Sequence, residues 1–191
     1  MKILVTTAGS AGPAMHVAER IAAVLTGLGE NVSVLPMNAV ESLKGYHAVV
    51  AGSLEQAGHW LPEALDFIRR YQGVFWAKPL AIFTVCPSLE TQKGAESRMV
   101  VMQYTAPVRS MAHPVSEGFF SDEIERDKET QPGERSRFKL GILFGMLREP
   151  DHRNHAAIEA WTTRLHDKLA QPGSLKARAN KEYRPAGHSS E

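Results

Sequence analysis

Three short stretches of small and polar residues follow apolar runs in this sequence and could hold a ligand. They are Thr7 to Ala14, Gly52 to Trp60 and Cys86 to Glu90. In α/β proteins, ligands bind where the carboxyl ends of neighbouring parallel strands meet. Backbone N–H groups there can hydrogen-bond an anion, and a helix that begins at such a loop adds the positive end of its dipole. The sequence therefore predicts a site built from these three loops.

The first loop has the composition of an anion-binding turn. It contains Gly9 and Gly12, and Pro13 is suited to the first position of a helix. The loop does not match the glycine-rich motif of nucleoside triphosphatases, and it lacks the third glycine of a dinucleotide-binding fingerprint. Two interpretations stay open: a phosphate-binding loop, and a tight strand-to-helix turn that needs small residues for packing.

A few other side chains suggest chemistry. Cys86 is either a reactive thiol or, as we favour, a small buried apolar residue, because no cation is evident beside it in the sequence. His59 either hydrogen-bonds a ligand or is a polar residue at the start of a helix. His152 and His155 have metal-like spacing, but no third ligand is identifiable, so we expect a surface position and no metal site.

The hydrophobic pattern indicates which elements position these loops. Short apolar runs predict five strands, and apolar residues at helical spacing predict the helices between them. The expected strands cover 2–6, 31–35, 48–51, 80–84 and 114–120. The expected helices run from Pro13 to a stop at Gly29, over 61–71, in part of 91–111, and over 155–169. In the last of these a core-facing stripe is expected, formed by Ile158, Trp161, Leu165 and Leu169. This alternation predicts a mostly parallel sheet with helices on both faces.

The last third of the chain is less regular. Residues 121–137 are rich in charge and predict a solvated loop, and residues 136–147 predict a helix. Its segment 138–147 is apolar nearly all round, so it either packs on the sheet or docks on a membrane surface, a redox partner or a second copy of the chain. Large apolar residues almost vanish from 171–191, which predicts a flexible tail after a single domain at 1–170.

Composition excludes several classes of protein. The 191 residues carry 22 Lys plus Arg and 21 Asp plus Glu, giving a formal net charge of +1. A chain so nearly neutral has no strong field toward nucleic acid, which we do not expect as a partner. One cysteine excludes an internal disulfide framework and suits a reducing cytoplasm. No apolar run reaches the length of a membrane span, and the first residues do not resemble a signal peptide.

Several segments taken together resemble the flavodoxin-domain family that includes menaquinone-dependent protoporphyrinogen oxidase. The resemblance covers about residues 1 to 170, and its most specific pieces are Ala-Gly-His-Trp-Leu-Pro and Ile-Glu-Ala-Trp. It is carried by Met1 to Glu19, Ala48 to Ser53, Ala57 to Pro62 and Asp151 to Trp161. It implies an α/β, flavodoxin-like three-layer sandwich with a five-stranded parallel sheet and an FMN site in the three loops.

The resemblance also implies which residues hold the flavin. The first loop would wrap the phosphate, the second would pass along one face of the isoalloxazine ring, and the third would touch its other side. The chain departs from the family at Gly12-Pro13-Ala14, where hydroxyl side chains are common, and at Gln56, where an aromatic residue is common. The implied positions are Thr7, Gly9, Ser10, Ala11, Gly12, Pro13, Ala14, Ser53, Leu54, Gln56, Gly58, His59, Cys86, Pro87 and Ser88.

Two functions follow from these observations. The first is an FMN-dependent oxidoreductase or electron-transfer protein that serves a redox partner or a small-molecule substrate. Quinone and porphyrinogen are among the substrates that this function includes. The second is a flavodoxin-like domain that has lost its cofactor and acts as a binding or assembly module. Pro13, Ala14 and Gln56 favour the second function, whereas Gly52, Gly58 and His59 favour the first.

Overall fold

A computed structural model describes residues 1–86, 102–121 and 152–170 of the chain. Five parallel strands form one sheet in the order β2-β1-β3-β5-β6, and the short β4 pairs antiparallel with β3. The strands are β1 (Lys2–Thr7), β2 (Asn31–Pro36), β3 (Ala48–Gln56), β4 (His59–Trp60), β5 (Leu80–Cys86) and β6 (Ser116–Ser121). The predicted five-stranded parallel sheet is confirmed.

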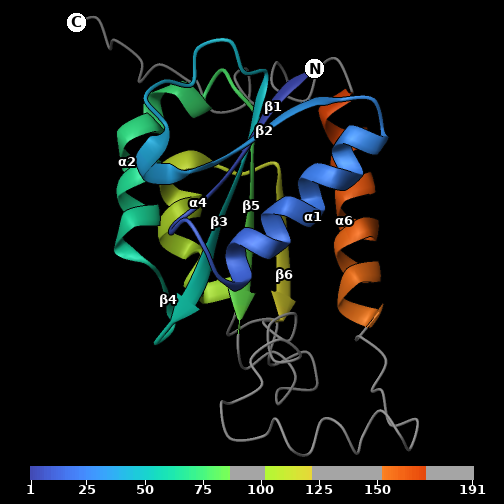
Figure 1. Cartoon of the computed structure of the whole chain (residues 1–191). Helices are drawn as coiled ribbons and strands as arrows, with labels where there is room; N and C mark the ends of the chain where they lie inside the picture. The colour runs from blue at the N-terminus through green and yellow to red at the C-terminus, as the bar shows by residue number, and fades with distance from the viewer. Residues whose placement is uncertain (87–101, 122–151, 171–191) are drawn as a thin grey trace, which may run out of the picture.

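Helices cover both faces of this sheet (Figure 1). One face carries α1 (Pro13–Gly27) and α6 (His152–Ala170), and the other carries α2 (Pro62–Phe75) and α4 (Ala106–Ala112). The 3₁₀ turn η1 (Met37–Ala39) follows β2. Parallel strands need crossover connections such as these helices. Because helices cover both faces of the sheet, the side chains on both faces of each strand are buried and the strands are continuous apolar runs. The three-layer α/β arrangement is the one that the alternating pattern predicts.

The helix after the first loop begins and ends as its sequence predicts. Pro13 is its first residue, with Gly12 before it at φ 95°. At the other end, the Glu30 N–H donates to the Leu25 carbonyl at 3.1 Å and the Gly29 N–H to the Thr26 carbonyl at 2.9 Å. This pair of bonds is the Schellman motif, which requires the positive φ of 89° at Gly29. Helix α1 therefore lies with its N-terminus at the first loop.

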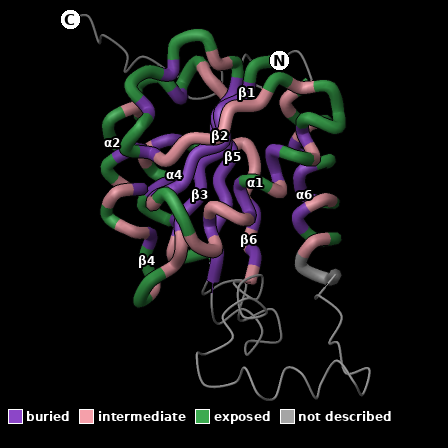
Figure 2. Tube along the Cα trace, viewed as in Figure 1, coloured by how far each residue is buried: buried purple, intermediate pink, exposed green. Residues whose placement is uncertain are grey.

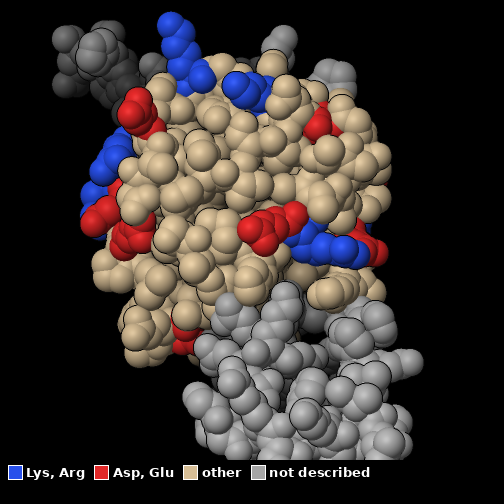
Figure 3. All heavy atoms as spheres, viewed as in Figure 1, with Lys and Arg blue, Asp and Glu red and all other residues tan. Residues whose placement is uncertain are grey.

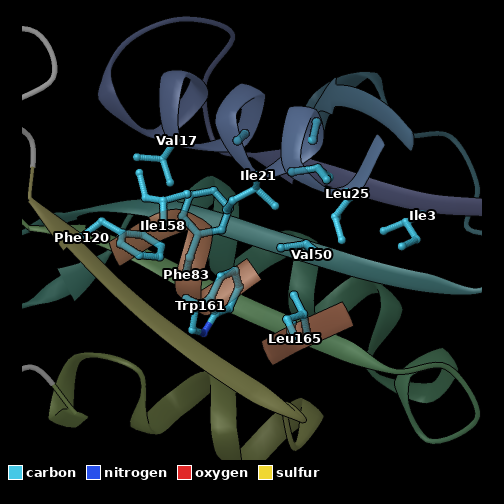
Figure 4. Packing of buried hydrophobic residues seen from close by; sticks show 14 of the residues in the cluster. Ile3, Val17, Ile21, Leu25, Val50, Phe83, Phe120, Ile158, Trp161 and Leu165 are labelled. Atoms are coloured by element: carbon cyan, nitrogen blue, oxygen red, sulfur yellow. The ribbon is translucent and has the colours of Figure 1, made fainter. Parts of the chain in front are cut away.

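Two apolar layers hold the sheet between its helices, and buried residues follow the strands (Figure 2). In the layer under α1 and α6, the predicted stripe of α6 supplies Ile158, Trp161 and Leu165 (Figure 4). The Trp161 ring meets Phe120 edge-on at 5.7 Å between ring centroids, and its Nε1–H donates to the Glu117 carbonyl at 3.0 Å. The closing helix is thus part of the core.

Strand β3 is longer than the sequence predicts. We expect a loop from Gly52 onward because glycine commonly interrupts strands, but the strand continues to Gln56. A Cβ at Gly52 would lie 2.0 Å from Cζ of Phe83, so this glycine makes room for a buried ring rather than a turn. The prediction of a strand end at Ala51 is wrong for that reason.

Other predicted segments lie partly or wholly outside the described residues. These are the rest of the third loop, residues 91–101, the charged loop 121–137, the apolar segment 138–147 and the tail 171–191. Across the described part of the chain, no helix combines the length and the apolar character that crossing a membrane requires. On the face shown in Figure 3, positive and negative side chains are interspersed among uncharged ones.

Candidate functional site

The strand order places the candidate loops at one edge of the sheet. The chain leaves β1 for β2 on one side and leaves β3 for β5 on the other, so the topology switches between the adjacent strands β1 and β3. The two strands pair side by side toward this edge, and directly after β1 the Ala8 N–H donates to the Gly52 carbonyl of β3 at 3.2 Å. Such a switch point is where open α/β sheets bind ligands.

The first loop has the backbone of an anion-binding turn. Gly9 has φ 80° and Gly12 has φ 95°, and the Thr7 hydroxyl donates to the Gly9 carbonyl at 3.1 Å. Among the described residues, none accepts a hydrogen bond from the N–H groups of Ser10, Ala11 or Gly12. These three donors lie at the N-terminus of α1, where the helix dipole favours negative charge.

A carboxylate already occupies part of this loop. Glu63 is in the first turn of α2, and its Oε2 accepts the Gly9 N–H at 3.0 Å. Its other oxygen, Oε1, is buried and has no partner among the described residues. No sequence pattern predicts this contact, because acidic residues are common in first turns and Glu63 is 54 positions from Gly9.

The second loop is a tight hairpin between β3 and β4. Gln56 pairs with His59, and the two residues between them, Ala57 and Gly58, have φ 52° and φ 81°. Positive φ at both positions is the signature of a type I′ turn, which suits the twist of paired strands. The Gly58 N–H donates to Oε1 of Glu55 at 2.5 Å, which fixes the turn to the strand before it.

Buried polar groups hold this hairpin on the sheet. The Ser53 hydroxyl accepts the Leu61 N–H at 3.1 Å and donates to the Leu54 carbonyl at 2.9 Å. The Trp60 indole N–H donates to the Thr84 hydroxyl at 2.8 Å, and its ring is buried. Ser53 and Trp60 therefore position the loop, and their polar groups are used within the protein.

Tyr104 brings an aromatic ring to the same place. A Cβ at Gly58 would lie 3.3 Å from Cε1 of Tyr104, so the ring lies close to the hairpin turn. Burial raises the pKa of the Tyr104 phenol, and the nearby Glu55 carboxylate and Cys86 thiol raise it further. The phenol thus stays neutral at physiological pH. No sequence pattern singles out Tyr104, because its contact with Gly58 joins residues far apart in the chain.

The implied flavin positions differ in what they expose. Ser10, Ala11, Gln56 and His59 are exposed at this edge. Thr7, Ala14, Ser53 and Cys86 are buried, and Ala14 packs in the core beneath α1. The remaining residues are intermediate in burial (Gly9, Gly12, Pro13, Leu54 and Gly58) or outside the described part of the chain (Pro87 and Ser88).

No group of three metal-ligating side chains gathers in the described ranges. Cys86 ends β5 with its side chain fully buried, which agrees with the apolar interpretation of this residue. The chemistry that the described site offers is therefore anion binding by backbone N–H groups beside an aromatic ring and a β-hairpin.

The parallel sheet order and the switch-point loops define a flavodoxin-like α/β protein. The chain matches the family described as Flavodoxin domain over residues 4–127. It therefore belongs to the flavodoxin-domain family.

Solved structures share this fold. A short-chain flavodoxin associated with a bacterial microcompartment has a TM-score of 0.58 and 14% sequence identity, with 89% of this chain and 99% of that chain covered. Oxidised flavodoxin 2 from Bacillus cereus has a TM-score of 0.56 and 16% identity, covering 88% and 99%. Flavodoxin from Fusobacterium nucleatum, bound to flavin mononucleotide, has a TM-score of 0.53 and 11% identity, covering 87% and 98%. No curated protein matches the sequence.

Proposed function

We propose that this chain is an FMN-binding electron-transfer protein. The observation that carries the proposal is the 8–12 loop with its unused N–H groups at the β1–β3 switch point. The β3–β4 hairpin follows the second of these strands, and the Tyr104 ring lies beside its turn. Membership of the flavodoxin-domain family supports FMN as the cofactor, and one neighbour of the same fold contains it. When bound, FMN would supply one- and two-electron transfer.

The residues present fit this cofactor. Ser10, Ala11 and Gly12 have N–H groups that no described residue uses, which suits a phosphate at the start of α1. Tyr104 presents a neutral aromatic ring beside the hairpin, and aromatic rings gain free energy by stacking. It thereby supplies an aromatic residue at the site although the hairpin has Gln56.

Substitution of Tyr104 tests the ring part of this site. We expect Tyr104→Ala to weaken FMN binding about tenfold, because the stacking surface is lost, and Tyr104→Phe to bind within about threefold of the wild type. Fluorescence titration of the apoprotein with FMN measures both, with far-UV circular dichroism as the check of folding. Equal FMN affinity of folded Tyr104→Ala and wild type would contradict this role.

The redox partner or substrate that exchanges electrons with the FMN has to be identified by assay. The sequence resemblance to menaquinone-dependent protoporphyrinogen oxidase rests on its motifs alone, so quinone and porphyrinogen chemistry stay predictions. A redox partner is in keeping with flavodoxin-like proteins, which generally transfer electrons to other proteins. The cytoplasmic location likewise stays a prediction from the single cysteine. Reduction of a quinone by the FMN-loaded protein, compared with the apoprotein, tests the first of these.

A further inference from the structure

Glu63 places a negative charge where the proposed cofactor has its phosphate. Its Oε2 accepts the Gly9 N–H at 3.0 Å, across the switch point from its own helix. The loop N–H groups that follow Gly9 are the donors assigned above to the phosphate. A flavin phosphate bound to these donors would therefore lie close to the carboxylate, and the two negative charges would repel each other.

Two buried polar atoms, one on α2 and one on β1, have no hydrogen-bond partner among the described residues. One is Oε1 of Glu63, and the other is the hydroxyl of Thr6, which β-strand alternation places on the same face of β1 as Leu4, the face covered by α2. Buried polar atoms are nearly always hydrogen-bonded in folded proteins. An anion bound in the loop, or a movement of the Glu63 side chain, would change the hydrogen bonding of Glu63 Oε1, which points to a contact that can rearrange.

We propose that Glu63 determines the flavin specificity of this site. Its carboxylate acts as an internal anion that lowers the affinity for FMN but not for riboflavin, which has the same ring and no phosphate. The chain would then discriminate between FMN and riboflavin less than a loop with free donors does. This inference rests on the proposed function, because it assigns the first loop to the phosphate.

The isosteric substitution Glu63→Gln removes the charge and keeps an oxygen for the Gly9 N–H. Fluorescence titration of the wild-type and Glu63→Gln apoproteins with FMN and with riboflavin gives the four affinities needed. We expect Glu63→Gln to bind FMN at least tenfold more tightly and riboflavin within twofold of the wild type.

Asp66→Asn is the matched control. Asp66 is one turn further along α2, exposed and paired with Arg69, so its substitution removes the same charge from the same helix outside the loop. We expect it to change both affinities by less than twofold. Equal gains in FMN affinity from Asp66→Asn and Glu63→Gln would overturn the proposal in favour of a general charge effect.

The remaining outcomes separate this inference from the proposed function. FMN binding by the wild type with no gain, or a loss, in Glu63→Gln overturns the role of Glu63 and leaves the proposed function intact. FMN binding by Glu63→Gln alone supports the role of Glu63. Binding of neither flavin by either protein, with both folded by circular dichroism, overturns the proposed function and this inference with it.

Discussion

Glu30 ties together three parts of the chain at the end of the sheet opposite the candidate site. Its carboxylate pairs with the amino group of Met1 through Oε2, and its Oε1 is 2.9 Å from Nε2 of His166 in α6. The hydrogen bond from the Met1 ammonium lowers the pKa of Glu30 below its ordinary value, against the opposing effect of burial, and His166 lowers it further. The folded state therefore favours the charged carboxylate.

This contact predicts a pH-dependent part of the stability. Because the pKa of Glu30 is lower in the folded than in the unfolded chain, its contribution is present above the unfolded value and disappears as pH falls through the folded value. We expect Glu30→Gln to cost about 1 kcal/mol near neutral pH and progressively less below about pH 4.5. Urea unfolding of both proteins between pH 7 and pH 3 measures this, and a constant difference across that range would refute the assignment.

At the scale of elements, most of the fold follows from local sequence. Helix α1 begins at Pro13 and its Schellman motif ends at Gly29, and both positions have a backbone reason that one residue type satisfies. The apolar runs became strands because both faces of the sheet are covered. The predicted end of β3 is wrong, because Gly52 makes room for the Phe83 ring and no local sequence pattern reveals that contact.

The site was less accessible to sequence reasoning than the fold. The sequence predicts a first loop directly after β1, as the structure has it, because parallel strand ends share one edge. Of the predicted second loop, 52–60, only the turn between Gln56 and His59 is a loop, since β3 continues to Gln56. Glu63 and Tyr104 were missed, because their contacts with Gly9 and Gly58 join residues far apart in the chain. Periodicity places a side chain on one face of its own element, but it does not say which distant loop that face meets.

Two glycine substitutions test the explanation of the β3 boundary. We expect Gly52→Ala to destabilise the protein by about 3 kcal/mol, because its Cβ would lie 2.0 Å from the fully buried Phe83 ring. Gly73→Ala is the control within helix α2, where an added Cβ has no atom within 4 Å, and we expect a gain of up to about 1 kcal/mol. Thermal and urea unfolding of both variants gives the two signs, and a stable Gly52→Ala would show that β3 is positioned differently.

At the scale of the whole molecule, α6 completes a core that the matched family segment does not include. The match ends at residue 127, whereas Ile158, Trp161 and Leu165 of α6 are buried in the layer under α1 (Figure 4). Helix α6 is thus an integral part of the sandwich. This agrees with the sequence prediction of a core-facing stripe on that helix.

A truncation in α6 measures how much this helix contributes. Leu165 is fully buried, so we expect Leu165→Ala to cost about 3 kcal/mol through the lost apolar contact and the cavity left behind. Leu28, which is 41% exposed, is the control, and we expect Leu28→Ala to change the free energy of unfolding by less than about 0.5 kcal/mol. Similar losses from the two variants would mean that α6 does not pack on the sheet in solution.

An absorption spectrum shows whether the switch-point loops hold FMN. The purified protein is incubated with FMN, desalted, and its absorption recorded from about 300 to 550 nm beside a sample never exposed to added flavin. We expect flavin bands that stay with the protein after desalting, because the N–H groups of the 8–12 loop and the Tyr104 ring fit the cofactor. A folded protein that is colourless in both samples, and does not bind FMN at tens of micromolar in equilibrium dialysis, would contradict it and favour a binding or assembly module.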